Sequence, residues 1–274
     1  MKKVLVTGAN GMLGQDLCPT LEDNGFETVE TDVENMDITN IEAVRSFVKN
    51  AAPDAVVHCA AYTNVDKAEE EPELARKINV LGTENVAKVC AENDIPLVYI
   101  STDYVFDGTK KEPYLPYDEI NPINVYGQTK ADGEKAVLEN CEKYYITRTS
   151  WLYGIHGKNF VETMISLADK PELKVVNDQT GCPTWTQELS NGICTLLTEE
   201  APYGIYHVCG SGKTTWYEFA KEIFKLAGLE VNLKPCKTSE FPRPAKRPKF
   251  SVMYNDNICR TWKSALKDYM ELRG

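Results

Sequence analysis

A tyrosine and a lysine four residues apart could carry proton-transfer chemistry in this 274-residue chain. At this spacing Tyr126 and Lys130 would lie on one face of a helix. An ammonium group beside a phenol stabilises the phenolate, so we expect the pKa of Tyr126 to fall below its free value of about 10. Such a tyrosine can donate or accept a proton near neutral pH. Tyr217 and Lys221 repeat the spacing, so the pair by itself also fits two residues on a solvated helix face.

The segments that surround the first pair distinguish it from the second. Asn121-Pro122 predicts a turn, because proline restricts both its own backbone and that of the preceding residue. Helix-favouring residues follow, which predicts a helix directly after the turn. Residues 96–102 are typical of a buried strand, and its last residue, Thr102, can sit beside the phenol in a parallel sheet. No strand ending in Ser or Thr comes shortly before Tyr217. We therefore predict that the catalytic residues are the first pair together with Thr102.

The N-terminal segment predicts a dinucleotide-binding site. A strand at residues 3–7 runs directly into Gly-x-x-Gly-x-x-Gly at residues 8–14, which opens a helix. Glycines there allow a tight turn and close approach to a pyrophosphate, which the helix N-terminus stabilises. Asp32 ends the next strand, where a carboxylate suits the ribose hydroxyls of NAD and repels the 2′-phosphate of NADP. We expect NADH, with NADPH left open; a βα turn without a ligand and a capping aspartate are the alternatives.

Further elements place small or polar residues at the same edge of a sheet. Residues 53–61 are typical of a strand ending in small side chains, which leaves room for a ligand. His58 lies inside this apolar strand and fits a core histidine better than a catalytic one. Asp37 or Thr39 is expected to cap the helix that precedes the strand at residues 53–61. One long helix, through residues 63–89, is expected after that strand.

Composition indicates a protein that acts on a small molecule. Net charge −11 and a pI of about 4.9 disfavour nucleic acid or an anionic membrane as the main partner. The nine cysteines have no ligand spacing and are typical of reduced thiols in the cytoplasm. No apolar run approaches the roughly 18 residues of a membrane span, and the N-terminal one is too short for a secretion signal. We expect a cytoplasmic protein that binds neither nucleic acid nor membrane.

The order of these elements predicts an α/β fold with a doubly wound parallel, Rossmann-like sheet. We expect residues 1–150 to form a dinucleotide-binding domain whose sheet later elements rejoin. Residues 151–274 should form mainly a smaller α/β substrate-binding domain, with the active site in the crevice between the two. Residues 210–214 resemble a phosphate loop but lack its first glycine. A helix cap at Thr214 or Thr215 is expected there instead.

Taken jointly, the motifs resemble the extended short-chain dehydrogenase/reductase family, which acts mostly on nucleotide sugars. The resemblance is carried by Thr7-Gly8-x-x-Gly11-x-x-Gly14, by Thr102 and by Tyr126-x-x-x-Lys130. Within this family, the chain is similar to the dTDP-4-dehydrorhamnose reductases over essentially its whole length. The segments that carry this closer similarity are residues 58–69, 101–108 and 177–184.

The resemblance implies hydride transfer from NADH or NADPH to the C4 ketone of dTDP-4-dehydro-β-L-rhamnose, giving dTDP-β-L-rhamnose. Tyr126 would protonate the forming alkoxide, Lys130 would bind the nicotinamide ribose, and Thr102 would hydrogen-bond the oxygen. The expected cofactor contacts are Gly8, Asn10, Gly11, Met12, Gly14, Asp32, Asp37, Ile38, Ala61, Tyr62, Thr63, Tyr126 and Lys130. The expected substrate contacts are Thr102, Asp103, Trp151, Arg243 and Arg247.

The last two of these residues belong to a proline-braced basic run at residues 241–251 in an otherwise acidic chain. Arg243 and Arg247 could pair with the substrate diphosphate, and the resemblance places a similar Arg-Pro segment near the nucleotide sugar. A solvated linker before the last helix is the alternative.

Two other functions stay open at this point. A redox-neutral epimerase or dehydratase of the same family would keep its NAD bound. A dehydratase, however, needs an Asp-Glu pair after the strand-end threonine, whereas Asp103-Tyr104 follows Thr102 here. A catalytically silent regulatory subunit is the second alternative, and the intact Thr102, Tyr126 and Lys130 argue against it.

The resemblance also raises the question of a metal ion. Some members of the reductase family dimerise through magnesium held by carboxylates, for which Asp16 and Glu188 are possible counterparts. The C-terminal residues 269–274 do not clearly match that arrangement. We therefore predict no metal site and leave a homodimer open.

Overall fold

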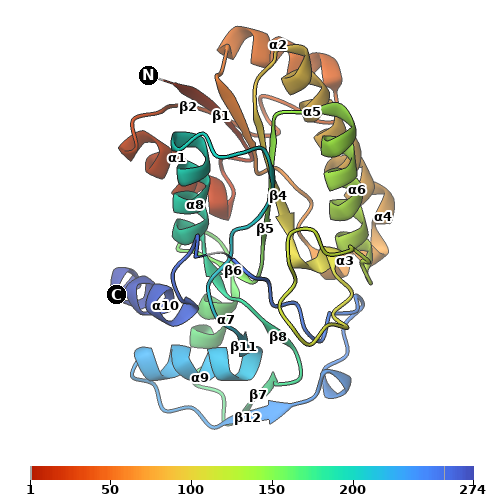
Figure 1. Ribbon diagram of the computed structural model, residues 1–274. Coiled ribbons are helices and arrows are strands. Elements are labelled where there is room, and N and C mark those ends of the chain that lie inside the picture. The colour runs from red at the N-terminus through yellow and green to blue at the C-terminus, as the bar shows by residue number, and fades with distance from the viewer. Residues whose placement is uncertain (1, 256) are drawn as a thin grey trace.

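The computed structural model of the chain describes residues 2–255 and 257–274. At its centre lies a sheet of six parallel strands in the order β2-β1-β3-β4-β5-β10 (Figure 1). This confirms the predicted α/β fold with a doubly wound parallel sheet. The strands are β1 (Lys3–Thr7), β2 (Glu27–Thr31), β3 (Ala55–His58), β4 (Leu97–Thr102), β5 (Tyr144–Thr149) and β10 (Gly204–His207).

Helices cover both faces of this sheet. Successive residues of a strand point to opposite faces, so Val4 and Val6 of β1 pack on one side and Leu5 packs on the other. A strand buried on both faces is apolar throughout, which is why β1 is apolar without alternation. The helices of the first face are α1 (Met12–Asp23) and α8 (Thr186–Thr198). Those of the second face are α2 (Ile41–Ala51), α5 (Thr83–Glu92) and α6 (Val125–Asn140).

The expectation of one long helix between β3 and β4 is wrong. The chain instead forms α3 (Val65–Glu70), α4 (Pro72–Arg76) and a π-helical turn, η1 (Lys77–Gly82), before α5. Pro72 separates the first two pieces because proline has no N–H to donate to the preceding turn.

The predicted cap of α2 is also wrong. Asn40 is the N-cap, and its side-chain oxygen accepts hydrogen bonds from the backbone N–H groups of Glu42 and Ala43. The Asp37 carboxylate instead accepts bonds from the backbone N–H and the hydroxyl of Thr39.

A second group of elements lies below the sheet in Figure 1 and has its own core. Its helices are α7 (Phe160–Ser166), α9 (Trp216–Leu226) and α10 (Trp262–Arg273). Its short strands are β6 (Leu152–Tyr153), β7 (Leu173–Val176), β8 (Thr180–Gly181), β9 (Thr184–Trp185), β11 (Thr214–Thr215) and β12 (Leu233–Cys236). The described residues also form the 3-10 turns η2 (Asp103–Val105) and η3 (Thr238–Glu240). Thr215 caps α9 as predicted, because its hydroxyl accepts from the Glu218 N–H.

The C-terminal half contributes one strand and one helix to the layers around the central sheet. Strand β10 extends the sheet beside β5, and α8 packs against α1, with Leu189 and Ile193 in the same core as Leu13 and Leu17. The division at residue 150 stays a prediction.

The strand order reverses between β1 and β3, since the chain runs from β1 outward to β2 and then returns to the other side for β3. In open parallel sheets, ligands bind beyond the carboxyl ends of the strands at such a switch point. Within residues 2–255 and 257–274, none of the helices combines the length and the apolar character needed to span a bilayer.

Candidate active site

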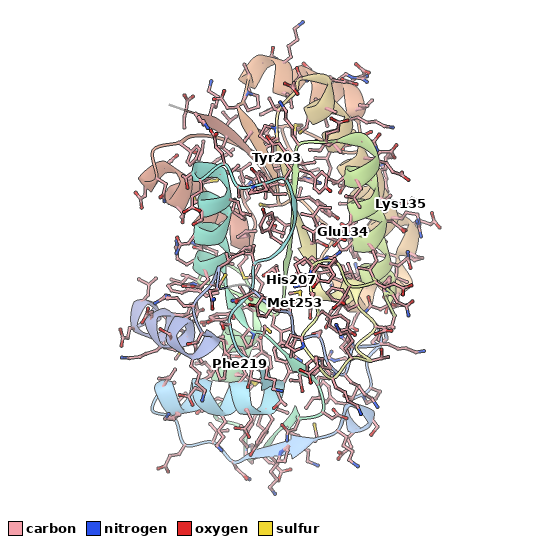
Figure 2. All side chains as sticks on the ribbon, viewed as in Figure 1. Glu134, Lys135, Tyr203, His207, Phe219 and Met253 are labelled. Carbon is pink, nitrogen blue, oxygen red and sulfur yellow. The ribbon has the colours of Figure 1, made fainter. Side chains whose placement is uncertain are left out.

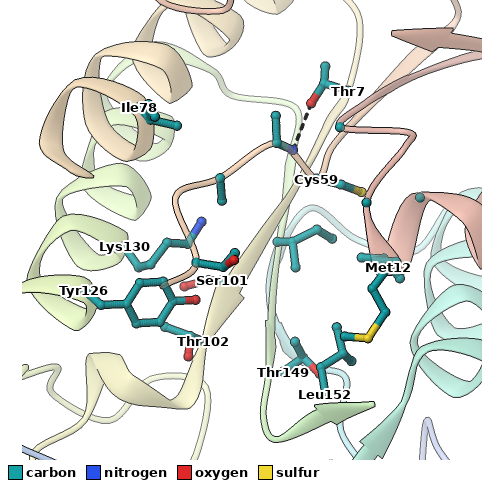
Figure 3. A pocket seen from close by; sticks show the side chains of 18 of the residues that line it. Thr7, Met12, Cys59, Ile78, Ser101, Thr102, Tyr126, Lys130, Thr149 and Leu152 are labelled. Atoms are coloured by element: carbon teal, nitrogen blue, oxygen red, sulfur yellow. Dashed lines mark hydrogen bonds between the residues drawn. The ribbon is translucent and has the colours of Figure 1, made fainter. Parts of the chain in front are cut away.

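A cleft of about 760 Å³ lies at the carboxyl ends of the central strands (Figure 3). Its walls come from the ends of β1, β2, β4 and β5, from the segment after β3, from α1 and α6, and from the second group of elements. The cleft therefore lies at the strand edge that the switch point indicates. The predicted site residues that line it are Gly8, Gly11, Met12, Gly14, Asp32, Asp37, Ile38, Ala61, Thr63, Thr102, Asp103, Tyr126, Lys130 and Trp151. Asn10, Tyr62, Arg243 and Arg247 are not part of the lining.

The three glycines after β1 form a cradle that larger residues would fill. Gly8 has a φ of +65°, and a Cβ atom on it would lie 2.7 Å from the backbone N of Ala60. A Cβ atom on Gly14 would lie 2.5 Å from the Cα of Ala9. The tight turn and the close packing of α1 on the strands therefore both require glycine. The cradle opens into the cleft at the N-terminus of α1, which fits the diphosphate of a dinucleotide.

Asp32 lies at the other side of this cradle, directly after β2. Its carboxylate accepts hydrogen bonds from the backbone N–H groups of Asn10, at 3.2 Å, and Val33, at 2.8 Å. The backbone of Asn10 thus orients Asp32. Tyr62 points elsewhere, because its hydroxyl donates to Glu71 at 2.7 Å.

Tyr126 and Lys130 project from the first turns of α6 into the cleft beside Thr102 (Figure 3). Asn124 caps this helix, and its side-chain oxygen accepts from the Gly127 N–H at 2.7 Å. A Cβ atom on Gly127 would collide with the carbonyl oxygen of Tyr104, so glycine allows α6 to approach the turn after β4. The sequence thus correctly predicted the helix, its start and the neighbouring strand end.

The predicted shift of the Tyr126 pKa is wrong, because the pKa is raised and not lowered. Burial raises the pKa of Tyr126 to about 12, although a hydrogen bond with Thr102 acts to lower it. Burial also lowers the pKa of Lys130 to about 7, while the nearby Glu134 acts to raise it. Lys130 Nζ lies 4.1 Å from the ring centroid of Tyr99, a cation–π contact. Desolvation disfavours the charged form of both groups, and it outweighs the attraction between them that the spacing suggested.

Asp103 is a buried acid next to this group. Thr102 Oγ1 donates to its carboxylate at 3.1 Å and Ser251 Oγ donates at 2.5 Å. Burial raises the pKa of Asp103 to about 7, although these two hydrogen bonds act to lower it. Ser251 was not singled out from the sequence. Its only signal was its position at the end of the basic run.

Trp151 lines the cleft together with Trp216, which was not among the residues predicted for the site. Their ring centroids are 3.5 Å apart and their planes differ by 7°. Two tryptophans that are distant in the sequence carry no pairing signal, so this contact could not be predicted.

The basic run is held against the protein at some positions and exposed at others: Ala245, Pro248 and Ser251 are buried, whereas Phe241 and Arg243 are exposed. Arg247 Nη1 donates to Asp66 Oδ1 at 2.6 Å, and Arg243 Nη1 lies 3.9 Å from the other oxygen of that carboxylate. Asn124 Nδ2 donates to the Lys246 carbonyl at 2.8 Å, next to the start of α6. Pairing of these arginines with a diphosphate stays a prediction, and it would require them to exchange Asp66 for the substrate.

Other candidates from the sequence have structural roles. His58 is buried, with Nδ1 2.7 Å from Thr7 Oγ1, and burial lowers its pKa to about 3. This confirms a core histidine. Tyr217 packs against the core of the second group of elements.

The two carboxylates considered for magnesium have protein partners. Asp16 accepts from the Thr186 hydroxyl, and Glu188 Oε1 accepts from Arg260 Nη2 at 2.7 Å. Across the parts of the chain that the structure describes, no three His, Cys, Asp or Glu residues are grouped so as to hold a metal ion.

The chain is similar to known proteins over nearly its whole length. The family described as RmlD substrate binding domain matches residues 1–272. A dTDP-4-dehydrorhamnose reductase from Streptomyces griseus is 44% identical over 95% of this chain and 87% of its own length.

Two crystal structures of proteins that are also named dTDP-4-dehydrorhamnose reductase are similar to this chain. The one from Clostridium acetobutylicum is 48% identical with a TM-score of 0.96, over 98% of this chain and 99% of that one. The one from Bacillus anthracis, in complex with NADP, is 42% identical with a TM-score of 0.96, over 99% of this chain and 100% of that one.

Proposed function

Because the chain belongs to the family described as RmlD substrate binding domain, we propose that it reduces the C4 ketone of dTDP-4-dehydro-β-L-rhamnose to the alcohol. NADH or NADPH is the reductant. The observation that supports this most directly is the convergence of Thr102, Tyr126 and Lys130 in one cleft with a glycine cradle. Relatives named for this activity match nearly the whole chain.

A reduced nicotinamide, when bound, supplies the hydride. The glycine cradle would hold the diphosphate of the cofactor and Asp32 would hold its adenosine ribose. These residues fit the group, because a side chain at Gly8 or Gly14 would collide with neighbouring backbone.

Tyr126 acts as the general acid. A pKa raised to about 12 keeps its hydroxyl protonated at neutral pH, so the proton is available when the ketone oxygen gains negative charge. The alkoxide that forms is a stronger base than a phenolate, so the transfer is favourable. The proton moves from Tyr126 Oη to the oxygen on C4.

Thr102 and Lys130 support that transfer. The hydroxyl of Thr102 ends β4 beside the phenol and can hydrogen-bond the reacting oxygen. Lys130, when protonated, stabilises the phenolate that remains on Tyr126. Because its pKa is lowered to about 7, Lys130 can also take up or release a proton near neutral pH.

A redox-neutral dehydratase is disfavoured by the residues that follow Thr102. Asp103 is present, but Tyr104 stands where a dehydratase carries its second acid. Asp103 is also 2% exposed and already accepts two hydrogen bonds.

The experiment is to incubate the purified protein with dTDP-4-dehydro-β-L-rhamnose and one equivalent of NADH or NADPH. We expect stoichiometric loss of nicotinamide absorbance and formation of dTDP-β-L-rhamnose. Conversion of the sugar without consumption of the nicotinamide would indicate a redox-neutral enzyme. No conversion with either cofactor would indicate a silent relative.

The same assay tests the cofactor preference. Asp32 would repel a 2′-phosphate, whereas the Bacillus anthracis relative was crystallised with NADP. We propose that NADH gives the higher kcat/KM, and that Asp32→Ser narrows the difference between the two cofactors. A higher kcat/KM with NADPH in the unchanged protein would contradict this.

A further inference from the structure

The segment Asn177–Thr184, one of the motifs behind the family resemblance, contributes no residue to the lining of the cleft. Gln179 of this segment nevertheless hydrogen-bonds Trp216, and Gly181 lies against the ring of Trp151, two residues that do line the cleft. These contacts suggest that the motif has a role other than proton or hydride transfer.

The two indoles form one wall of the cleft. Trp151 follows β5 and Trp216 is the first residue of α9. Their stacking at 3.5 Å with nearly parallel planes leaves no space for a ligand between them. Phe160 backs Trp216 at a ring-centroid distance of 4.5 Å. A substrate can therefore meet this pair only at its cleft-facing surface.

The backbone of Trp151 is strained. Its φ is +48°, a left-handed conformation that is rare for a bulky residue. Such conformations persist where the surroundings over-determine them, and they cluster at ligand sites. The position of this indole is therefore imposed by its neighbours.

The motif supplies those neighbours. Gln179 Oε1 accepts from the indole N–H of Trp216 at 3.1 Å. A Cβ atom on Gly181 would lie 2.5 Å from Cε2 of Trp151, so glycine is what leaves room for that ring. Asn177 Oδ1 accepts from the Thr215 hydroxyl at 2.6 Å, and Thr215 caps the helix that begins with Trp216.

We propose that Trp216 is a positioning residue which, together with Gln179 and Gly181, holds Trp151 as a rigid wall of the ketosugar subsite. The inference rests on the proposed function. A deoxyhexose has a C–H-rich face, which an aromatic wall accommodates, and a pre-set indole loses little ordering entropy on binding. Trp216 acts through Trp151 and takes no part in the transfer of the proton or hydride.

The first test is Trp216→Leu, which removes the stack. Loss of an aromatic pair of this kind should raise the KM for the ketosugar roughly two- to tenfold. The kcat and the KM for the nicotinamide cofactor should stay nearly unchanged. Trp216→Phe keeps an aromatic ring and should give a smaller rise. In a Trp151→Ala background, Trp216→Leu should add no further effect, because the residue it positions is gone.

The second test displaces the Trp151 indole without replacing a tryptophan. Gly181→Ala should push the Trp151 indole off its partner, raise the KM for the ketosugar and reduce the near-ultraviolet circular dichroism of the rigid indoles. Gly204→Ala is the matched control, since the nearest atom to its added Cβ is 4.0 Å away. Trp185→Phe removes a buried tryptophan outside the cleft lining and should keep the wild-type KM.

An equal rise in KM on Trp216→Leu in both the wild-type and the Trp151→Ala backgrounds would overturn the proposal, as would an unchanged KM in Gly181→Ala with reduced dichroism. If the wild-type protein does not reduce the ketosugar, the proposed function fails. The dichroism of Gly181→Ala needs no substrate, and an unchanged spectrum would then still reject the positioning by the motif.

Discussion

Tyr126 keeps its proton because burial, which raises its pKa, outweighs the hydrogen bond with Thr102, which acts to lower that pKa. The spacing of Tyr126 and Lys130 suggested the opposite, since it shows proximity but not solvent exclusion. Both side chains lie in a cleft wall where a charge is poorly solvated. At the scale of the residue, desolvation decides which form each group takes before substrate arrives.

Replacing Tyr126 by phenylalanine should lower kcat by about 10²- to 10⁴-fold, because the general acid is lost while the ring remains. The KM for the nicotinamide cofactor should change little. Steady-state kinetics with the ketosugar measure both. Tyr217→Phe is the matched control, since Tyr217 and Lys221 have the same spacing on α9 outside the cleft. Near wild-type turnover in Tyr126→Phe would remove Tyr126 from the mechanism.

Asp103 should make the protein less stable as the pH rises. Its pKa is about 7 in the folded protein, against an ordinary value of 3.8 for an aspartate, so the folded state binds a proton that the unfolded state has released. This contribution is fully present below pH 3.8 and is lost as the pH rises through about 7. Asp103→Asn removes it, and the magnitude is on the order of a few kcal/mol. Urea unfolding of both proteins between pH 4 and 8 measures the difference.

Asp107, in the same loop, should affect the stability with the opposite dependence on pH. Burial acts to raise its pKa, but hydrogen bonds from Thr109, Tyr114 and Asn121 together lower it. Asp107 therefore contributes stability above its unfolded pKa that is lost on acidification. His58 and His207, whose pKa values burial lowers to about 3, are common to all the variants and cancel in the comparison. A pH-independent difference between wild type and Asp103→Asn would contradict the shift.

At the scale of the element, α6 carries a polar anchor on its inner face. Glu134 accepts from Arg148 Nη2 at 2.7 Å and from Ser101 Oγ at 2.5 Å, and the charged side chains are each 2% exposed. Figure 2 shows Glu134 directed toward the sheet and Lys135 directed away from it. The anchor ties the helix that holds Tyr126 and Lys130 to the strands that end at Thr102 and Thr149.

Glu134→Gln should reduce the free energy of unfolding by about 3–5 kcal/mol, because it leaves the Arg148 guanidinium buried without a counter-charge. Denaturant unfolding measures this. Glu139→Gln on the same helix is the matched control. Glu139 is 61% exposed and paired with Lys135 at 3.7 Å, so its loss should cost less than about 0.5 kcal/mol. Equal effects of the two substitutions would show that the buried pair is not an anchor.

At the scale of the whole molecule, the second half of the chain completes the first. Strand β10 forms an edge of the sheet, and α8 supplies Leu189 and Ile193 to the core under α1. Part of the second half therefore shares a core with α1, the helix that follows the glycine cradle.

Because of this shared core, we expect a single cooperative unfolding transition. All four tryptophans follow residue 150, so their fluorescence reports the C-terminal half, whereas far-ultraviolet circular dichroism reports the whole chain. The two denaturant curves should coincide. Separate midpoints would show that residues 1–150 and 151–274 unfold as independent units.

The local elements of this protein follow from short-range sequence patterns. The strand before Gly8, the helix that begins after Asn124, the Thr215 cap and the strand ending at Thr102 all appear where their residues predict them. Apolar runs, caps and glycines act through neighbouring backbone, so the sequence alone suffices. The interruption at Pro72 was also visible in the sequence, but helical periodicity on both sides concealed it.

Only the tertiary structure determined which residues each functional side chain contacts. The stack of Trp151 on Trp216, the hydrogen bond from Ser251 to Asp103 and the pairing of Arg247 with Asp66 join segments far apart in the chain. No spacing rule connects such positions. Burial likewise depends on the whole fold, and burial reversed the expected pKa shift of Tyr126. The sequence determined which side chains stand at the strand ends, and the packing of the two halves determined their partners and protonation.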